Sequence, residues 1–71
     1  KMKGYERLHP NAQNLFSKVH SLHLQAMGRD ERKKYELPNI KQIVQNNKEQ
    51  CVEVHYQNGE FFKYYRNLTW G

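Results

Sequence analysis

The pair Asn58-Gly59 separates two segments that have the composition of β-strands. Residues 51–56 read CVEVHY and residues 60–65 read EFFKYY, so apolar and aromatic residues dominate on both sides of the pair. An Asn-Gly pair in this position is the strongest short-range signal for a β-hairpin, because both central positions of a type I′ turn need a positive φ. The pair therefore predicts two antiparallel strands joined by a two-residue loop.

The segment before this hairpin has the spacing of a long amphipathic helix. Apolar residues recur at helical intervals through residues 10–27. Pro10 suits the first turn of a helix, Asn11 is a candidate cap, and Gly28 can end the helix. We therefore expect one helix over about residues 10–27.

Two shorter elements are predicted between this helix and the hairpin. Asp30 is a candidate cap for a short second helix. Pro38 should stop that helix, because the residue before a proline is steered away from helical angles. Residues 40–45 read IKQIVQ, and their β-branched residues indicate a further strand.

These elements predict an α+β fold, in which one long amphipathic helix plus a short second helix pack on a three-stranded antiparallel β-meander. At 71 residues the chain has room for a single small domain. Within it we expect a flexible amino-terminal arm over residues 1–9, a helical half over residues 10–37 and the β-meander over residues 38–71.

A two-residue hairpin loop also predicts which side chains share a face of the sheet. It places Tyr56 opposite Phe61 and His55 opposite Phe62, and paired residues lie on the same face. The face expected to receive the long helix carries Val52, Val54, Tyr56, Phe61, Lys63 and Tyr65. The opposite, exposed face carries Cys51, Glu53, His55, Phe62, Tyr64 and Arg66. A shift by one residue would exchange the two faces.

The charge of the chain favours negatively charged partners. Twelve Lys and Arg residues against seven Asp and Glu residues give a net charge of +5. The leading hypothesis is a small non-enzymatic protein that binds nucleic acid, with a basic helical segment on phosphates and the exposed aromatic face on bases. The residues predicted to bind nucleic acid are Arg29, Arg32, Lys33, Lys34, His55, Phe62, Tyr64 and Arg66. Two plainer interpretations compete: the basic segment is a solvated helix face, or the amino-terminal arm or Trp70 covers the aromatic face.

The alternative hypothesis is a small regulatory or inhibitory protein that docks on a larger protein or self-associates. Tyr, Phe, Trp and Arg are typical of interfaces, and the edge strands of a meander can pair with another chain, including a second copy in a homodimer. The richness in Asn, Gln and Lys is typical of AT-rich genomes, so a phage or a mobile element is the kind of source expected for such a protein.

The motifs favour binding over catalysis. There is no glycine-rich phosphate loop, no serine nucleophile motif and no carboxylate cluster, so we predict no catalytic residue, no metal site and no cofactor. His20 and His23 are three residues apart, but zinc needs further ligands at close spacing. We interpret His23 as a half-buried member of the helix stripe and His20 as its solvent-facing neighbour.

Cysteine usage and hydropathy bear on the compartment. Cys51 is the only cysteine, which excludes an intrachain disulfide and fits a reducing environment. No apolar run approaches the roughly 20 residues that cross a bilayer, and the first ten residues lack the apolar stretch of a signal peptide. We therefore expect a cytoplasmic protein with no membrane partner.

Overall fold

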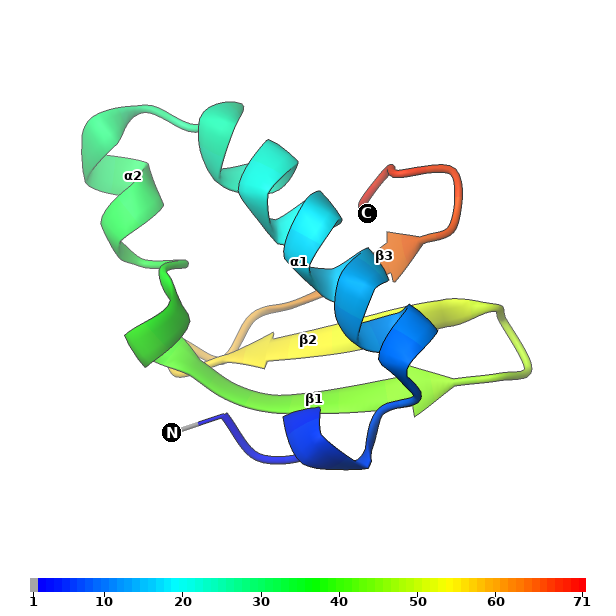
Figure 1. The fold of residues 1–71 in the computed structure, drawn as a ribbon. Coiled ribbons are helices and arrows are strands. Elements are labelled where there is room, and N and C mark those ends of the chain that lie inside the picture. Colours follow the sequence, from blue (N-terminus) through cyan, green and yellow to red (C-terminus); the bar gives the residue numbers. More distant parts are fainter. Residues whose placement is uncertain (1) are drawn as a thin grey trace.

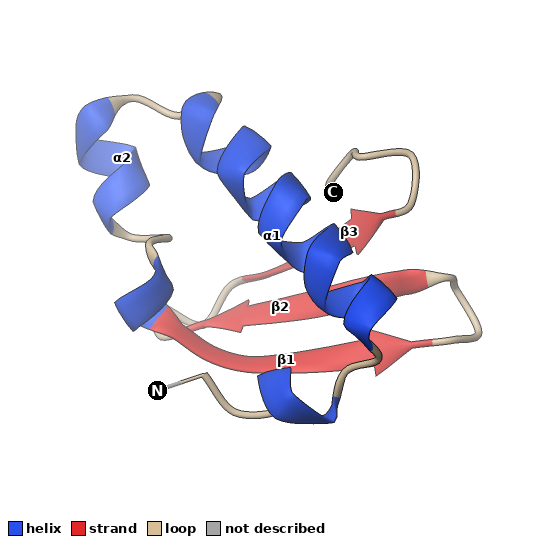
Figure 2. Cartoon of the chain, viewed as in Figure 1, coloured by secondary structure: helices blue, strands red, loops and turns tan. Residues whose placement is uncertain are grey.

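The helices and strands of the chain form two layers, as the computed structural model of residues 2–71 shows (Figures 1 and 2). The elements, in chain order, are the 3-10 helix η1 (Tyr5–Arg7), α1 (Pro10–Gln25), α2 (Arg29–Lys33), the 3-10 helix η2 (Leu37–Asn39), β1 (Ile40–Asn46), β2 (Cys51–Tyr56) and β3 (Phe61–Tyr65). The strands lie in the order β1-β2-β3 with antiparallel neighbours, and α1 lies across one face of the sheet. The predicted α+β class, with one long helix, one short helix and a three-stranded antiparallel sheet, is confirmed.

The ends of α1 differ slightly from the prediction. Pro10 occupies the first turn as expected, but the cap is His9, whose Nδ1 accepts a hydrogen bond from the backbone N–H of Asn11 at 3.1 Å. The helix ends at Gln25, two residues early, and Gly28 caps the start of α2 in an extended conformation. Asp30 therefore lies inside the first turn of α2 and is not its cap.

The predicted register of the hairpin is wrong by one residue. The observed pairs include Val54 with Phe62 and His55 with Phe61. The loop holds three residues, since the backbone N–H of Tyr56 donates to the carbonyl of Glu60 at 2.8 Å. Gly59 has a φ of 89°, but Asn58 is not among the described residues with a positive φ, so a type I′ turn is excluded. A turn followed by a single left-handed glycine is the usual form of a three-residue hairpin loop.

This shift reverses the predicted faces of β3. Tyr64 is fully buried and Phe62 is half-buried against the core, so the prediction that both lie on an exposed face is wrong. Phe61 and Tyr65 take their places on the outward face of the sheet, away from α1. Because aromatic residues occur as the doublets 61–62 and 64–65, the shift exchanges each ring for a neighbour of the same kind.

A hydrogen-bonded chain of polar side chains crosses the core beneath α1. His23 Nδ1 lies 2.9 Å from the hydroxyl of Tyr64, which lies 2.7 Å from the hydroxyl of Tyr56. His20 Nε2–H donates to the backbone carbonyl of Tyr35 at 2.7 Å. The interpretation of His20 as solvent-facing is therefore wrong: both histidines are buried, and their hydrogen bonds satisfy the ring nitrogens that face these partners.

The outer edges of the sheet are partly covered by the two ends of the described chain. Along β1, the backbone N–H of Lys3 donates to the carbonyl of Lys41, and the N–H of Ile43 donates to the carbonyl of Lys3 at 2.7 Å. Along β3, Trp70 forms an antiparallel bridge with Tyr64. Residues 2–9, predicted as a flexible arm, thus lie beside β1, and less of each edge is free to pair with another chain.

Candidate functional site

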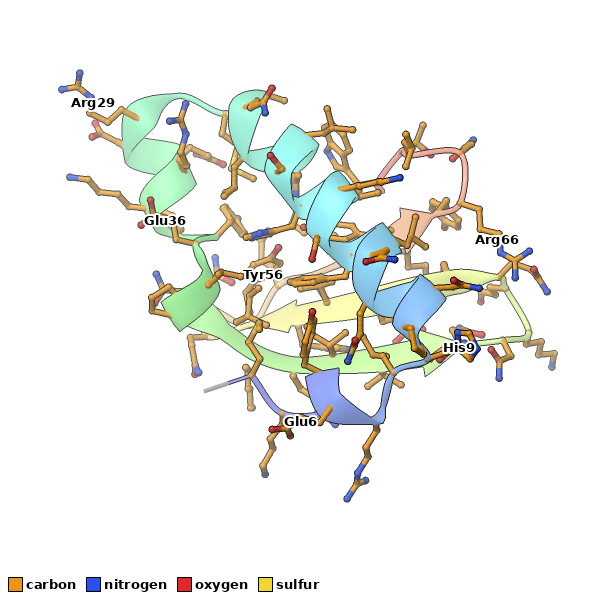
Figure 3. All side chains as sticks on the ribbon, in the orientation of Figure 1. Glu6, His9, Arg29, Glu36, Tyr56 and Arg66 are labelled. Carbon is orange, nitrogen blue, oxygen red and sulfur yellow. The ribbon has the colours of Figure 1, made fainter. Side chains whose placement is uncertain are left out.

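The eight residues predicted to bind nucleic acid do not form one surface. Arg29 and Arg66 lie at opposite ends of the molecule (Figure 3). Lys33 and Lys34 are exposed at the end of α2, near Arg29 in sequence. His55 is half-buried on the outward face of the sheet. Lys33 and Lys34 line a hollow of about 340 Å³. Arg66 lines a larger groove together with other basic residues.

Arg32 is tied to the turn between the helices. Its Nε–H donates to the backbone carbonyl of Leu24 at 3.1 Å, and its Nη2 donates to the carbonyl of Met27 at 3.3 Å. Carbonyls at the carboxyl end of a helix have no partner within the helix, so a guanidinium that binds them holds the turn in place. Arg32 therefore has a structural task that the basic pattern of residues 29–34 does not reveal.

A groove with a volume of about 690 Å³ lies between the amino-terminal half of α1, the β1–β2 turn and the segment after β3. We call it the basic groove. Its basic side chains are His9, Lys18 and Arg66. Within the described part of the chain, no acidic residue lines it. Figure 3 shows His9 and Arg66 at the end of the molecule where β1 turns into β2. A concave surface lined by charges of one sign concentrates ions of the opposite sign.

Amide side chains make up much of the remaining rim, namely Asn11, Asn14, Gln45, Asn46, Asn47 and Gln50. Some of these hold the β1–β2 turn: Gln45 Nε2 donates to Asn47 Oδ1 at 2.8 Å, and Gln50 Nε2 donates to the carbonyl of Asn47 at 3.3 Å. Among the hydrogen bonds of the described residues, none involves the side chain of Asn14, Lys18 or Arg66. The rim therefore offers charged donors beside amide groups that both donate and accept.

The floor of the basic groove is apolar. Its side chains are Ala12, Leu15, Cys51, Val52 and Leu68. Burial raises the pKa of the Cys51 thiol, so this group stays protonated near neutral pH. The floor thus offers apolar contact and no ionised group.

Two residues of the groove have an unusual backbone conformation. Gln50 has a φ of 58° and Leu68 a φ of 66°, and they are the two non-glycine residues with a positive φ in the described part of the chain. Both line the basic groove. Such conformations cost on the order of 1–3 kcal/mol each and are found disproportionately at functional sites. The presence of both residues in one groove distinguishes the basic groove from the rest of the described surface.

The outward face of the sheet is a second exposed feature. The rings of His55 and Phe61 stack with centroids 5.0 Å apart and planes 15° apart. Phe61 is 51% exposed and Val44 on β1 is 39% exposed. Glu53 lies beside them and accepts a hydrogen bond from Asn46 Nδ2 at 2.9 Å, which lowers the pKa of its carboxyl. This face is apolar and carries a carboxylate, which suits phosphate less well than the basic groove does.

Sequence reasoning missed the groove because its three walls are far apart in the chain. Asn11, Asn14 and Lys18 follow one another at spacings of three and four residues, which puts them on one face of α1 beside the apolar stripe. That spacing is the signal in the sequence from which this wall of the groove could have been found. Neither the β1–β2 turn nor the segment after β3 shows, in the sequence, that it lies against this face.

Comparison of the chain with protein-family models, with curated protein sequences and with solved structures gave no match. Across residues 2–71, no three His, Cys, Asp or Glu side chains come close enough to hold a metal ion. No helix in the same range is both long and apolar enough to cross a membrane.

Proposed function

We propose that this protein binds nucleic acid, without catalysis, through the basic groove. The observation that carries the proposal is the charge of the lining: its charged side chains are basic and none is acidic, in a chain with a net charge of +5. Phosphate contacts by Lys and Arg supply most of the sequence-independent affinity of nucleic-acid-binding proteins. Of the residues that the sequence-based hypothesis named, this proposal retains Arg66 in the groove, and it adds His9 and Lys18.

The distribution of the basic side chains supports two unequal contributions to the affinity for nucleic acid, one from the groove and one from α2. Lys18 stands on α1 and Arg66 follows β3, so a phosphate group in the groove is approached from two elements. Arg29 and Lys34 are exposed at the two ends of α2, and Figure 3 shows Arg29 at the far end of the molecule from Arg66. There they raise the general attraction for a polyanion. The proposal therefore assigns local contacts to the groove and a weak, long-range effect to α2.

Fluorescence anisotropy with labelled oligonucleotides tests this assignment with variants of equal charge change. Lys18→Gln and Arg66→Gln each remove one positive charge from the groove, and Lys34→Gln and Arg29→Gln each remove one from the region of α2. We expect the groove variants to weaken binding more and to reduce the slope of log K against log salt by about 1 each, as the loss of a phosphate contact does. Equal effects of all four variants, or no binding by the wild type at low salt, would contradict the proposal.

A second candidate function is docking on a protein through the outward face of the sheet. The exposure of Phe61 on this face supports it, because aromatic side chains dominate the energy of protein interfaces. Under this proposal the protein is a regulator or inhibitor, or associates with a second copy. Sedimentation of the wild type and of Phe61→Thr over a range of concentrations tests the self-association: we expect an oligomer that Phe61→Thr dissociates and that salt does not. A monomer at every concentration contradicts it.

A further inference from the structure

The shape and lining of the basic groove distinguish between forms of nucleic acid. A volume of about 690 Å³ falls within the roughly 300–1,000 Å³ of sites that enclose small ligands. In a duplex the Watson–Crick edges of the bases are paired inside the helix and only the groove edges stay exposed, and the phosphates lie on a convex surface. A concave site of this size suits a group that stands free of a duplex.

The side chains of the groove have the chemistry to hold such a group. An amide donates and accepts at once, so Asn and Gln match the donor and acceptor pairs on base edges. Asn14 stands on the rim without a hydrogen-bond partner among the described residues, and Gln50 stands across from α1 in the β1–β2 turn. Leu15 and Leu68 give an apolar surface for the face of a base.

From this arrangement, and resting on the proposed function, we infer that the basic groove binds a single-stranded nucleic acid and seats an unpaired base. The base lies on the apolar floor and its edge meets the amides of Asn14 and Gln50, while Lys18 and Arg66 bind the flanking phosphates. Proteins that recognise RNA sequences mostly read unpaired bases in this way. Gln50 and Leu68, which have a left-handed backbone conformation, lie on two walls of the basic groove.

Two kinds of variant separate base contacts from phosphate contacts. Asn14→Ala removes an amide from an exposed helical position, with Gln25→Ala on the far end of α1 as its matched control. Gln50→Gly removes the second amide, together with its hydrogen bond to the carbonyl of Asn47, and keeps the backbone free to adopt a positive φ. Lys18→Gln serves as the charge variant. Thermal unfolding of each variant establishes that it is folded.

The experiment measures binding of the full chain to ten-nucleotide single strands of A, C and T as DNA and of A, C and U as RNA, and to a duplex of equal length, at two salt concentrations. We expect the affinity for each single strand that binds to exceed the affinity for the duplex by about tenfold or more, which is the effect of one good base contact. Asn14→Ala and Gln50→Gly should weaken binding by about tenfold and change the order of preference among the bases, without a change in the salt slope. Gln25→Ala should match the wild type.

The possible failures are distinct. Equal binding of duplex and single strands, with the groove charge variants still the weakest, would overturn the inference and leave the proposed function intact. The inference would also be overturned if Asn14→Ala weakened binding only by changing the slope of log K against log salt. No binding to any oligonucleotide would overturn both.

Discussion

His23 of α1 and Tyr64 of β3 are joined in the core by a hydrogen bond of 2.9 Å between the imidazole Nδ1 and the hydroxyl. Both side chains are buried, and the ring of His23 also lies 5.0 Å from the ring of Trp70. This pair ties the helix layer to the sheet and to the segment that covers its edge. It also makes the stability of the fold depend on an ionisable group.

Acid should destabilise the protein below about pH 6.5. Burial, together with the nearby charge on His20, lowers the pKa of His23 to about 4. Between pH 6.5 and 4 the unfolded chain takes up a proton that the folded chain does not, so the free energy of unfolding falls as the pH falls. The loss attributable to His23 is up to about 3 kcal/mol. Burial also lowers the pKa of His20, which acts in the same direction.

Urea unfolding at pH 7, 5.5 and 4.5 measures this dependence, with His23→Asn as the comparison. Asn keeps a polar group near the position of Nδ1 but does not titrate. The variant should be less stable at pH 7 and should lose less stability on acidification than the wild type. Parallel pH profiles for the two proteins would show that His23 does not carry the effect.

Removal of the Tyr64 hydroxyl should destabilise the fold. This hydroxyl bonds both His23 and Tyr56, so Tyr64→Phe leaves two buried polar groups short of a partner, at a cost of about 1–3 kcal/mol. Tyr65→Phe is a matched control, because Tyr65 is the neighbouring tyrosine on the outward face. Denaturant unfolding should give little change for Tyr65→Phe. A larger effect there than at Tyr64 would contradict the observed register.

The adjacent phenylalanines should also respond unequally to truncation. Phe62 packs edge-on against His23, with ring centroids 4.5 Å apart, and belongs to the layer between the sheet and α1. Phe61 is 51% exposed. Phe62→Ala should cost about 3 kcal/mol and Phe61→Ala under about 1 kcal/mol in the free energy of unfolding. Equal costs would argue for the register that a two-residue loop produces.

Gly4 should be intolerant of a side chain. Its φ is 91°, and a Cβ at this position would meet the backbone carbonyl oxygen of Ile43 on β1. Gly4→Ala should therefore cost at least about 2 kcal/mol and weaken the pairing of Lys3 with β1. Gly28→Ala is the control, because a Cβ there meets nothing within 4 Å, and its cost should stay below about 1 kcal/mol. Amide exchange at Ile43 would be faster only in Gly4→Ala.

The elements of the fold were predictable because their signals are local. Helical spacing in residues 10–27 and the composition of residues 40–45 and 51–56 each depend on neighbours within a few positions. The register of the hairpin was not predictable, because the pair Asn58-Gly59 suits a two-residue loop and a three-residue loop equally well. The choice depends on the φ of Asn58, which the packing of Tyr64 beneath α1 helps to decide.

The basic groove was beyond sequence reasoning for a different reason. Lys18 and Arg66 are 48 positions apart in the numbering, and only the docking of α1 over the sheet brings their elements to one groove. Arg29, Lys33 and Lys34 are close in sequence, which is why the sequence-based prediction included them. Lys33 and Lys34 line a hollow of about 340 Å³, which is smaller than the basic groove of about 690 Å³. Tyr64 is buried and Phe62 is half-buried against the core, which removes the aromatic half of that prediction.

An amide NMR titration with a ten-residue single-stranded oligonucleotide tests most directly that the basic groove is the binding site. At low salt we expect the largest shifts at Asn14, Lys18, Gln50 and Leu68, fading as salt is raised. Shifts confined to residues 29–34 or to the outward face around Phe61, or no shifts at low salt, would contradict nucleic-acid binding in the groove.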